Sequence, residues 1–316
     1  VRVYLSIGRA AMEFTDQCYR SIGRANMSGK MPQVTYRSPT LSDLVSTLLV
    51  DQTDDHHFVA TQLDNPGHHI AGGHLAGQVL VAASRTAPGR SAHSLHVYYL
   101  RAGDAQYPVE VQVDAARDGG TLATRRITAR QDGEILLEAL ASFSAPVDAL
   151  DYQATIPDVP EPLSVPTMAE QLADYAEESG GFWVRDQPFE LRYIDPHPRL
   201  AKDSSDPAPH LRMWWRPTDT IPDDPALHAG LLAYLTGTTM LEAAMIPRGA
   251  LPAHTFSALI DHALWFHRPV DLSDWVLSDQ TSPSGIGGRG LASGTMYNRA
   301  GQLVCVATQE LYFGRG

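Results

Sequence analysis

Cysteine is scarce in this sequence, which contains only Cys18 and Cys305 among its 316 residues. Two cysteines are too few for the disulfide framework of a small secreted domain, and a reducing compartment is the simpler environment for them. The sequence also lacks a charged-then-apolar leader with a cleavage site, and it lacks an apolar run near the ~20 residues that span a bilayer. We therefore expect a cytoplasmic protein without a membrane span.

Positive charge is also in short supply. Lysine and arginine together number 24 against 36 aspartates and glutamates, which gives a net charge of −12. This balance argues against a general partner of nucleic acids or anionic membranes, so an anionic ligand would need a local basic patch. The length allows two units of ordinary domain size.

The pattern of apolar residues predicts the same order of elements twice, a helix followed by strands. In the first half we expect helices at 40–49 and 72–86 and strands at 93–103, 107–119, 122–133 and 134–143. In the second half we expect strands at 189–194 and 211–217, a helix at 223–245, and strands at 256–270, 275–284, 289–301 and 302–313.

The two halves also superpose in sequence. Arg101 aligns with Arg268 at an offset of 167, and Gly133 aligns with Gly301 at an offset of 168. A nearly constant offset indicates an internal duplication. We predict an α+β fold of two units, each a helix on an antiparallel sheet. The expected divisions are an extension without assigned function, the first unit, a linker and the second unit, at 1–32, 33–146, 147–185 and 186–316.

Several enzyme motifs are absent or out of context. GIGGRG, at 285–290, fits a dinucleotide-binding fingerprint, but a strand follows it instead of a helix. We interpret it as a glycine-rich bend at a sheet edge. No G-x-S-x-G turn occurs, and no histidine spacing has the pattern of a metal site, so we expect no metal or cofactor. Cys305 lies in an alternating strand and is predicted to be a core residue.

A few residues remain as candidates for chemistry. His74 follows a Gly-Gly turn at a helix start, where free backbone N–H groups bind anions or carbonyl oxygens. Asp261, His262 and His267 lie in IDHALWFHRP, either as acid–base groups or as satisfied polar residues of a strand beside the domain seam. Gln309 falls in the more apolar row of its strand. A buried amide there needs partners, and it is able to orient a water or a thioester carbonyl.

The sequence contains, in this order, GGHLAGQVL, HSLHVYYLRAGD, ARDGGTLATRRITARQDGEILLEALASF, IDHALWFHRP and VATQE. Through these stretches it resembles the acyl-CoA thioesterase II family from about residue 40 to its C-terminus. The resemblance implies a double-hotdog fold and hydrolysis of acyl-CoA to free fatty acid and CoA. It also implies direct attack by water, without a metal or covalent intermediate, and by fold-level analogy a homo-oligomer, either a dimer or a tetramer.

In that family an Asp, a Thr or Ser, and a Gln from the second unit are taken to position the water. Carried over residue by residue, the Gln falls on Gln309, the Asp falls on Gly237, and the Thr or Ser falls on Leu259. Two of the three groups are therefore missing. Without the carboxylate, nothing obvious at position 237 accepts a proton from water.

Two functions stay open. The first is a thioesterase of low or altered activity, in which Thr236, Thr238, Asp261 or His74 substitutes for the missing groups. The second is a non-hydrolytic acyl-CoA-binding or scaffold protein. In that case Gly237→Asp combined with Leu259→Thr should create activity if the pocket is intact. A hotdog hydratase would need a His/Asp motif that the sequence lacks.

Substrate-binding residues follow from the same reasoning. Gly73 and His74, at the start of the first unit's helix, are candidates for holding the thioester. Basic residues are required for the CoA phosphates, and Arg101 and Arg268 are the main candidates, beside Arg125, Arg126 and Arg289. Each of these arginines is equally well explained as a surface or structural residue.

Overall fold

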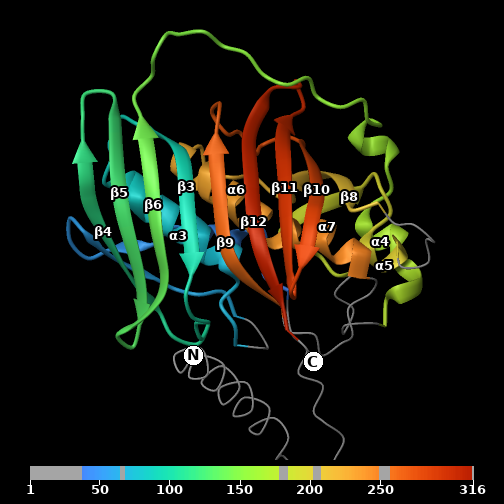
Figure 1. Ribbon diagram of the computed structural model, residues 1–316, viewed down its shortest axis with the longest axis horizontal. Coiled ribbons are helices and arrows are strands. Elements are labelled where there is room, and N and C mark those ends of the chain that lie inside the picture. The colour runs from blue at the N-terminus through green and yellow to red at the C-terminus, as the bar shows by residue number, and fades with distance from the viewer. Residues whose placement is uncertain (1–37, 65–67, 178–183, 202–207, 249–256, 315–316) are drawn as a thin grey trace, which may run out of the picture. The chain divides into compact units, whose positions relative to one another are not determined.

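The computed structural model describes residues 38–64, 68–177, 184–201, 208–248 and 257–314. The extension predicted at 1–32 lies outside the described residues. One antiparallel sheet of twelve strands runs through the described part of the chain, in the order β1-β2-β4-β5-β6-β3-β9-β12-β11-β10-β8-β7. Figure 1 shows this sheet in front of the central helices α3 and α6, with the first-half strands beside the second-half strands.

Elements of the first half follow the predicted order. The helices are α2 (Leu41–Leu48) and α3 (Gly72–Arg85), and the strands are β1 (Asp51–Gln52), β2 (His57–Ala60), β3 (Ser91–Tyr99), β4 (Val109–Asp118), β5 (Leu122–Gln131) and β6 (Glu134–Ser144). Helix α2 begins with a capping box in which the Thr40 side chain accepts from the Asp43 N–H. The two short strands β1 and β2 were not predicted.

The second half contains α6 (Pro225–Thr239) and the strands β7 (Phe189–Tyr193), β8 (His210–Pro217), β9 (Ser257–Phe266), β10 (Val276–Ile286), β11 (Arg289–Asn298) and β12 (Leu303–Phe313). Shorter helices are α4 (Met168–Gln171), α5 (Pro198–Ala201) and α7 (Leu241–Met245), with 3₁₀ turns at Pro162–Ser164, Ala173–Tyr175 and Ile246–Arg248. The single helix predicted at 223–245 is therefore wrong in one respect, because it divides at Met240 into α6 and α7.

The duplication is visible in the turns. Gly133 between β5 and β6 and Gly301 between β11 and β12 have φ angles of 79° and 80°. Both adopt the left-handed conformation that glycine tolerates best. Gly287 and Gly288, within GIGGRG, also have positive φ and form the hairpin turn between β10 and β11. The predicted glycine-rich bend is thus confirmed, but its place at a sheet edge is wrong, because β10 and β11 lie between β8 and β12 inside the sheet.

The two central helices lie unusually close together. A Cβ added to Gly77 of α3 would lie 2.6 Å from the Gly230 carbonyl oxygen of α6. A Cβ added to Gly237 of α6 would lie 2.4 Å from the Cα of Gly73 of α3. Real Cβ atoms do not approach other atoms so closely, so glycine at these positions is what allows the helices to meet.

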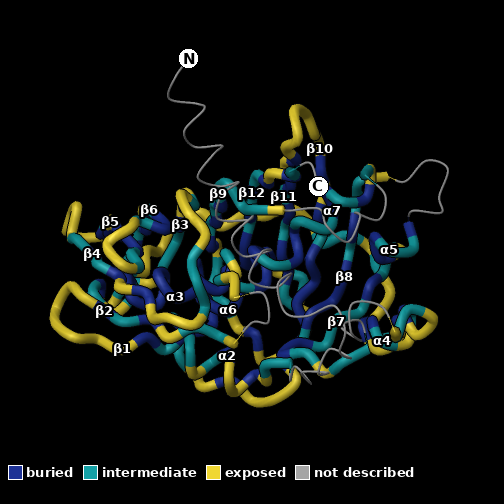
Figure 2. Tube along the Cα trace, turned by 90° about the horizontal axis from the view of Figure 1, so that it is seen from below, coloured by how far each residue is buried: buried dark blue, intermediate teal, exposed yellow. Residues whose placement is uncertain are grey.

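Helix α6 belongs to the protein core. By length and composition the stretch Pro225–Arg248 could cross a membrane, in contrast to the expectation from sequence, but 72% of its most apolar window is buried inside the protein. In Figure 2 the dark blue buried residues gather along α3, α6 and the inner side of the strands, whereas yellow marks loops at the periphery. The thiol of Cys305 is fully buried in β12, as predicted.

Candidate active site

A polar cluster lies where the start of α3, the middle of α6 and strands β9 and β12 converge. Gly73 of α3 and Gly237 of α6 are in backbone contact there. The ring of His262, from β9, reaches the same place, because a Cβ on Gly237 would lie 3.5 Å from its Cε1. Gln309, from β12, is directly opposite His262 in the sheet. The site is therefore built from both halves of the chain.

A β-bulge in β9 determines which residues face this site. Gln309 pairs with His262 and Glu310 with Asp261, but Leu311 pairs with Leu259, which leaves Ile260 as the extra residue. Because the bulge shifts the alternation by one residue, His262 and Leu259 both face the helices, as Gln309 does. A Cβ on Gly72 would lie 2.6 Å from Leu259 Cδ1, which places the leucine against the start of α3.

Gln309 and His262 carry unsatisfied polar atoms. Both side chains are fully buried. Among the described residues neither Nε2 nor Oε1 of Gln309 has a hydrogen-bond partner, and neither does Nδ1 of His262. The other imidazole nitrogen, Nε2, is 3.1 Å from the Thr236 hydroxyl oxygen on α6. Buried polar atoms are rarely left unpaired, which makes this cluster a candidate site for a further polar molecule.

The first turn of α3 adds backbone donors to the site. Ala71 caps the helix without a side-chain hydrogen bond. The N–H groups of the first helical residues, Gly72, Gly73 and His74, have no acceptor within the helix. Tyr99 donates its hydroxyl to the Gly72 carbonyl at 2.9 Å and holds this turn against β3. A carbonyl oxygen that gains negative charge would be stabilised by such N–H groups.

The His74 side chain points away from Gln309 and serves the packing of the helices. Its Nε2 is 2.9 Å from the Thr47 hydroxyl on α2, and its ring lies edge-on to Tyr234. Burial lowers the pKa of His74 to about 4, so the imidazole is neutral at pH 7. Only the backbone N–H of His74 is left to contribute to the site.

Asp261 and Thr238 are not brought to Gln309. Asp261 follows the alternation of β9 to the opposite face of the sheet, opposite Tyr98 and Glu310, and its Oδ1 accepts from the Glu310 N–H at 3.1 Å. Burial, together with the nearby Glu310 charge, raises the pKa of Asp261. The Thr238 hydroxyl donates within its own helix, to the Tyr234 and Leu235 carbonyls. The hydroxyl that does reach the cluster belongs to Thr236.

Sequence and structure comparisons identify the relatives of this chain. Residues 60–144 match the model of the acyl-CoA thioesterase N-terminal domain, and residues 190–312 match the acyl-CoA thioesterase model. Acyl-CoA thioesterase 2 of Haemophilus influenzae is 31% identical over 285 residues, covering 86% of this chain and 97% of the relative. The chain belongs to the acyl-CoA thioesterase II family.

Solved structures of the family agree with this assignment. A tesB protein of Mycobacterium avium subspecies paratuberculosis has 40% identity and a TM-score of 0.73, covering 87% of this chain and all of that one. An acyl-CoA thioesterase II of Mycobacterium marinum has 34% identity and a TM-score of 0.72, covering 86% and 98%. Hotdog-fold neighbours confirm the predicted double-hotdog α+β fold.

Within this family fold, the two basic candidates follow adjacent central strands and lie at opposite ends of them. Arg101 follows the end of β3 near the start of α3, is half exposed, and pairs with Glu134 at 3.0 Å. Arg268 follows the end of the antiparallel neighbour β9, pairs with Asp151, and donates to the Leu303 carbonyl at 2.8 Å. Arg101, but not Arg268, therefore lies at the strand end where α3 begins.

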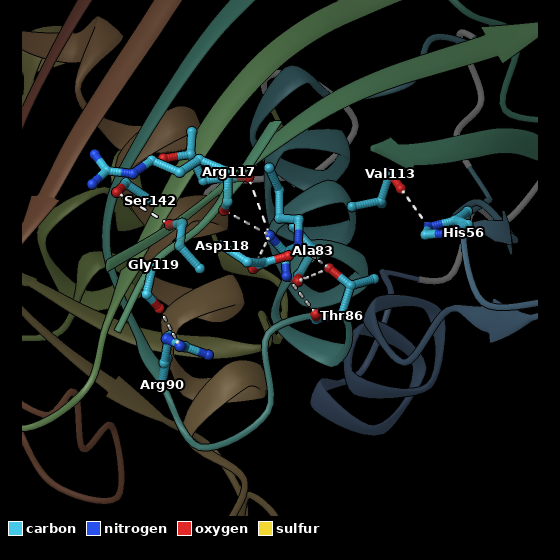
Figure 3. Close-up of polar contacts among 12 residues, drawn as sticks. His56, Ala83, Thr86, Arg90, Val113, Arg117, Asp118, Gly119 and Ser142 are labelled. Carbon is cyan, nitrogen blue, oxygen red and sulfur yellow. Dashed lines mark hydrogen bonds and ion pairs between the residues drawn. The ribbon is translucent and has the colours of Figure 1, made fainter. Parts of the chain in front are cut away.

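Arg125 has a structural role. Its guanidinium is buried, donates to the Thr86 hydroxyl and carbonyl, each at 2.8 Å, and pairs with Asp118 at 2.8 Å. Figure 3 labels two of these partners, Thr86 directly after α3 and Asp118 at the end of β4. An arginine whose donors are occupied inside the protein is a poor candidate for a phosphate contact. Arg126 pairs with Asp114, and Arg289 with Glu310.

His262 and Thr236 are the site residues that sequence reasoning weighed but did not favour. The alternation around Gln309 does indicate a buried amide, and it is confirmed. No pattern in the sequence shows that Thr236 faces His262, because that contact joins residues 26 positions apart across two elements. The described residues contain no group of three or more His, Cys, Asp or Glu side chains placed to hold a metal ion.

Proposed function

We propose that this protein hydrolyses acyl-CoA thioesters to a free fatty acid and CoA, by direct attack of water on the thioester carbonyl. The observation that carries the proposal is the fully buried Gln309 side chain, whose amide nitrogen and oxygen lack partners among the described residues. It lies in the second unit of a thioesterase-family fold, near a helix start whose first N–H groups have no acceptor within the helix. Family membership supplies the reaction class and the site supplies the polar groups.

In this proposal the Gln309 amide donates to the attacking water or to the thioester oxygen, and the first N–H groups of α3 stabilise the charge that develops on that oxygen. Removing one such donor commonly costs a catalysed acyl transfer about 10²–10³ in rate. Arg101 is the candidate for contacting the CoA phosphates, because it is exposed at the strand end where α3 begins. A homo-oligomer and a cytoplasmic location remain predictions.

Free-thiol detection across acyl-CoA substrates from short to long chains tests the proposal. We expect turnover above the uncatalysed rate for at least one chain length, and a loss of about tenfold or more in kcat for Gln309→Leu, which keeps the volume and removes the amide. Gln309→Glu, of nearly the same shape, shows whether the amide donor is needed. A panel without turnover at any length contradicts hydrolysis.

A second candidate function has one observation in its favour. Gly237 and Leu259 replace the family's carboxylate and hydroxyl, and the Gly237–Gly73 contact leaves no space for a side chain at position 237. A protein that binds acyl-CoA without hydrolysing it would fit these replacements. Isothermal titration with a non-hydrolysable acyl-CoA thioether, alongside the thiol assay, separates the two. Saturable binding without CoA release from true thioesters supports the binding protein.

A further inference from the structure

The hydrogen bond between Thr236 and His262 determines which imidazole nitrogen carries the proton. The Thr236 hydroxyl has one hydrogen, and its oxygen is 2.9 Å from the Leu232 carbonyl and 3.2 Å from the Ala233 carbonyl. Because both carbonyls only accept, the hydroxyl hydrogen is donated to them. The same hydroxyl oxygen, 3.1 Å from His262 Nε2, then accepts from an N–H on that nitrogen. In a neutral imidazole the other nitrogen, Nδ1, keeps its lone pair.

The surroundings of His262 keep this ring neutral. The elements packed against it contribute Thr236 and Gly237 from α6, Val97 from β3 and Gln309 from β12, none of which carries a charge. Burial alone lowers the pKa of His262 to about 3, without a contribution from any charged group. At neutral pH Nδ1 therefore keeps its lone pair, and it has no partner among the described residues.

The imidazole of His262 lies beside Gly237, the position onto which the resemblance carries the family's carboxylate. His262 Cε1, the carbon between the two ring nitrogens, is 3.5 Å from where a Cβ on Gly237 would be. Gln309, its directly paired neighbour on β12, presents an unpartnered amide on the same face. A water that contacts the Gln309 amide would lie on the same face of the sheet as this lone pair.

We propose that His262 is the proton acceptor for the attacking water in this chain, and that Thr236 is the positioning residue that holds its tautomer. The inference rests on the proposed thioester hydrolysis. Water transfers one proton to Nδ1 while its oxygen bonds to the thioester carbon. The tetrahedral intermediate then expels the sulfur, the carbon–sulfur bond breaks, and the proton on Nδ1 passes to the leaving thiolate. The products are a carboxylic acid and the CoA thiol, and His262 returns to its neutral state.

The decisive variant is His262→Gln, because a glutamine amide can still donate to Thr236 but has no base at the Nδ1 position. We expect kcat to fall by a factor of about 10² or more, the usual contribution of a positioned base. Binding of a non-hydrolysable acyl-CoA thioether should change by less than threefold. The matched control is His228→Gln, since His228 is also a buried histidine but contacts the Pro222 carbonyl through Nε2 and accepts from the Leu272 N–H through Nδ1. It should retain kcat.

Thr236 is tested by its effect on the tautomer. In wild-type protein, ¹⁵N NMR of the imidazole should show His262 with its proton on Nε2 and bare Nδ1. Thr236→Val should lose that preference and lower kcat, and Thr236→Ser should restore both. The NMR measurement keeps the proposal testable if His262→Gln fails to fold. A wild-type His262 that carries its proton on Nδ1 would overturn the proposal without any substitution.

The outcomes separate the two proposals. A wild-type protein without turnover overturns the hydrolysis on which this role depends. Turnover in the wild type that survives within twofold in folded His262→Gln leaves hydrolysis standing and overturns the role of His262. A fall in kcat that Thr236→Ser fails to restore after Thr236→Val overturns the positioning role of Thr236.

Discussion

The contact between Gly237 and Gly73 predicts that Gly237→Ala destabilises the protein, which is the opposite of the usual effect of this substitution in a helix. Replacing a glycine inside a helix by alanine normally stabilises it by about 1 kcal/mol. At Gly237, however, the new Cβ would lie 2.4 Å from Gly73 Cα and 3.1 Å from Gly73 N. Both are backbone atoms of α3, so no side-chain rotation relieves the clash and the two central helices must move apart.

The size of the expected stability loss follows from how closely the two helix backbones approach each other. Ordinary carbon–carbon separation begins near 3.4 Å, so α3 and α6 must separate by roughly 1 Å at this point, in a core where overpacking costs about 1–3 kcal/mol. After the gain in helix propensity is subtracted, we expect Gly237→Ala to lower the free energy of unfolding by about 1–2 kcal/mol. Gly237→Asp should lose more, because its side chain is larger and buries a charge among uncharged groups.

Urea denaturation followed by far-UV circular dichroism measures this loss. The control is Gly120→Ala, because no atom lies within 4 Å of its added Cβ and its φ is compatible with alanine. That variant should unfold within about 0.5 kcal/mol of the parent or slightly above it. A Gly237→Ala protein as stable as the parent would refute the reasoning. The same geometry reverses the sequence-based expectation that Gly237→Asp with Leu259→Thr creates activity, and we expect no gain in thiol release.

Three other perturbations have expected outcomes. Burial lowers the pKa of His74 to about 4, that of His262 to about 3 and, with a contribution from the charge on Arg199, that of His197 to about 4. Since these histidines bind protons mainly in the unfolded state, their full contribution to the free energy of unfolding is present above about pH 6.5. The free energy of unfolding falls toward pH 4, by up to ~1.4 kcal/mol per pH unit for each histidine. Urea midpoints at three pH values measure this slope, and a midpoint that does not change with pH contradicts the prediction. Arg125→Met should lower the free energy of unfolding by about 1–3 kcal/mol, because it leaves buried acceptors unpaired. Arg101→Gln should change it by less than ~1 kcal/mol, because Arg101 is half exposed. Thermal melts of the two variants measure the difference. Thr40→Ala should cost about 1 kcal/mol by removing the capping box of α2, and Thr40→Ser should recover most of it in the same melts.

The fold was largely predictable because its signals are local. Alternation of apolar residues predicts the strands, and the turn at Asp132 and Gly133 is marked by residues that tolerate positive φ. The internal duplication carries the same signals into the second half. The short strands β1 and β2 were not predicted, because two and four residues are too few to show a period.

Gly237 shows what a local pattern leaves out. In sequence it is a weak point in an apolar helix, at the position onto which the resemblance carries the family's carboxylate. In the structure it lies against the backbone of α3, as does Gly230, which lies against Gly77. Glycine is required at position 237 because Gly73, 164 residues away in the chain, lies against it. The sequence of α6 alone does not reveal this contact.

The bulge at Ile260 explains why the site was harder to predict than the fold. In an unbroken strand Leu259 and Asp261 share one face, and both were candidates for the same site. The extra residue turns Leu259 to the face of His262 and leaves Asp261 on the other side of the sheet. The Gly73 contact leaves no space for a side chain at position 237, and the bulge turns Asp261 away from Gln309. Among the described residues this leaves the imidazole of His262, on β9 itself, as the proton acceptor that we propose beside Gln309.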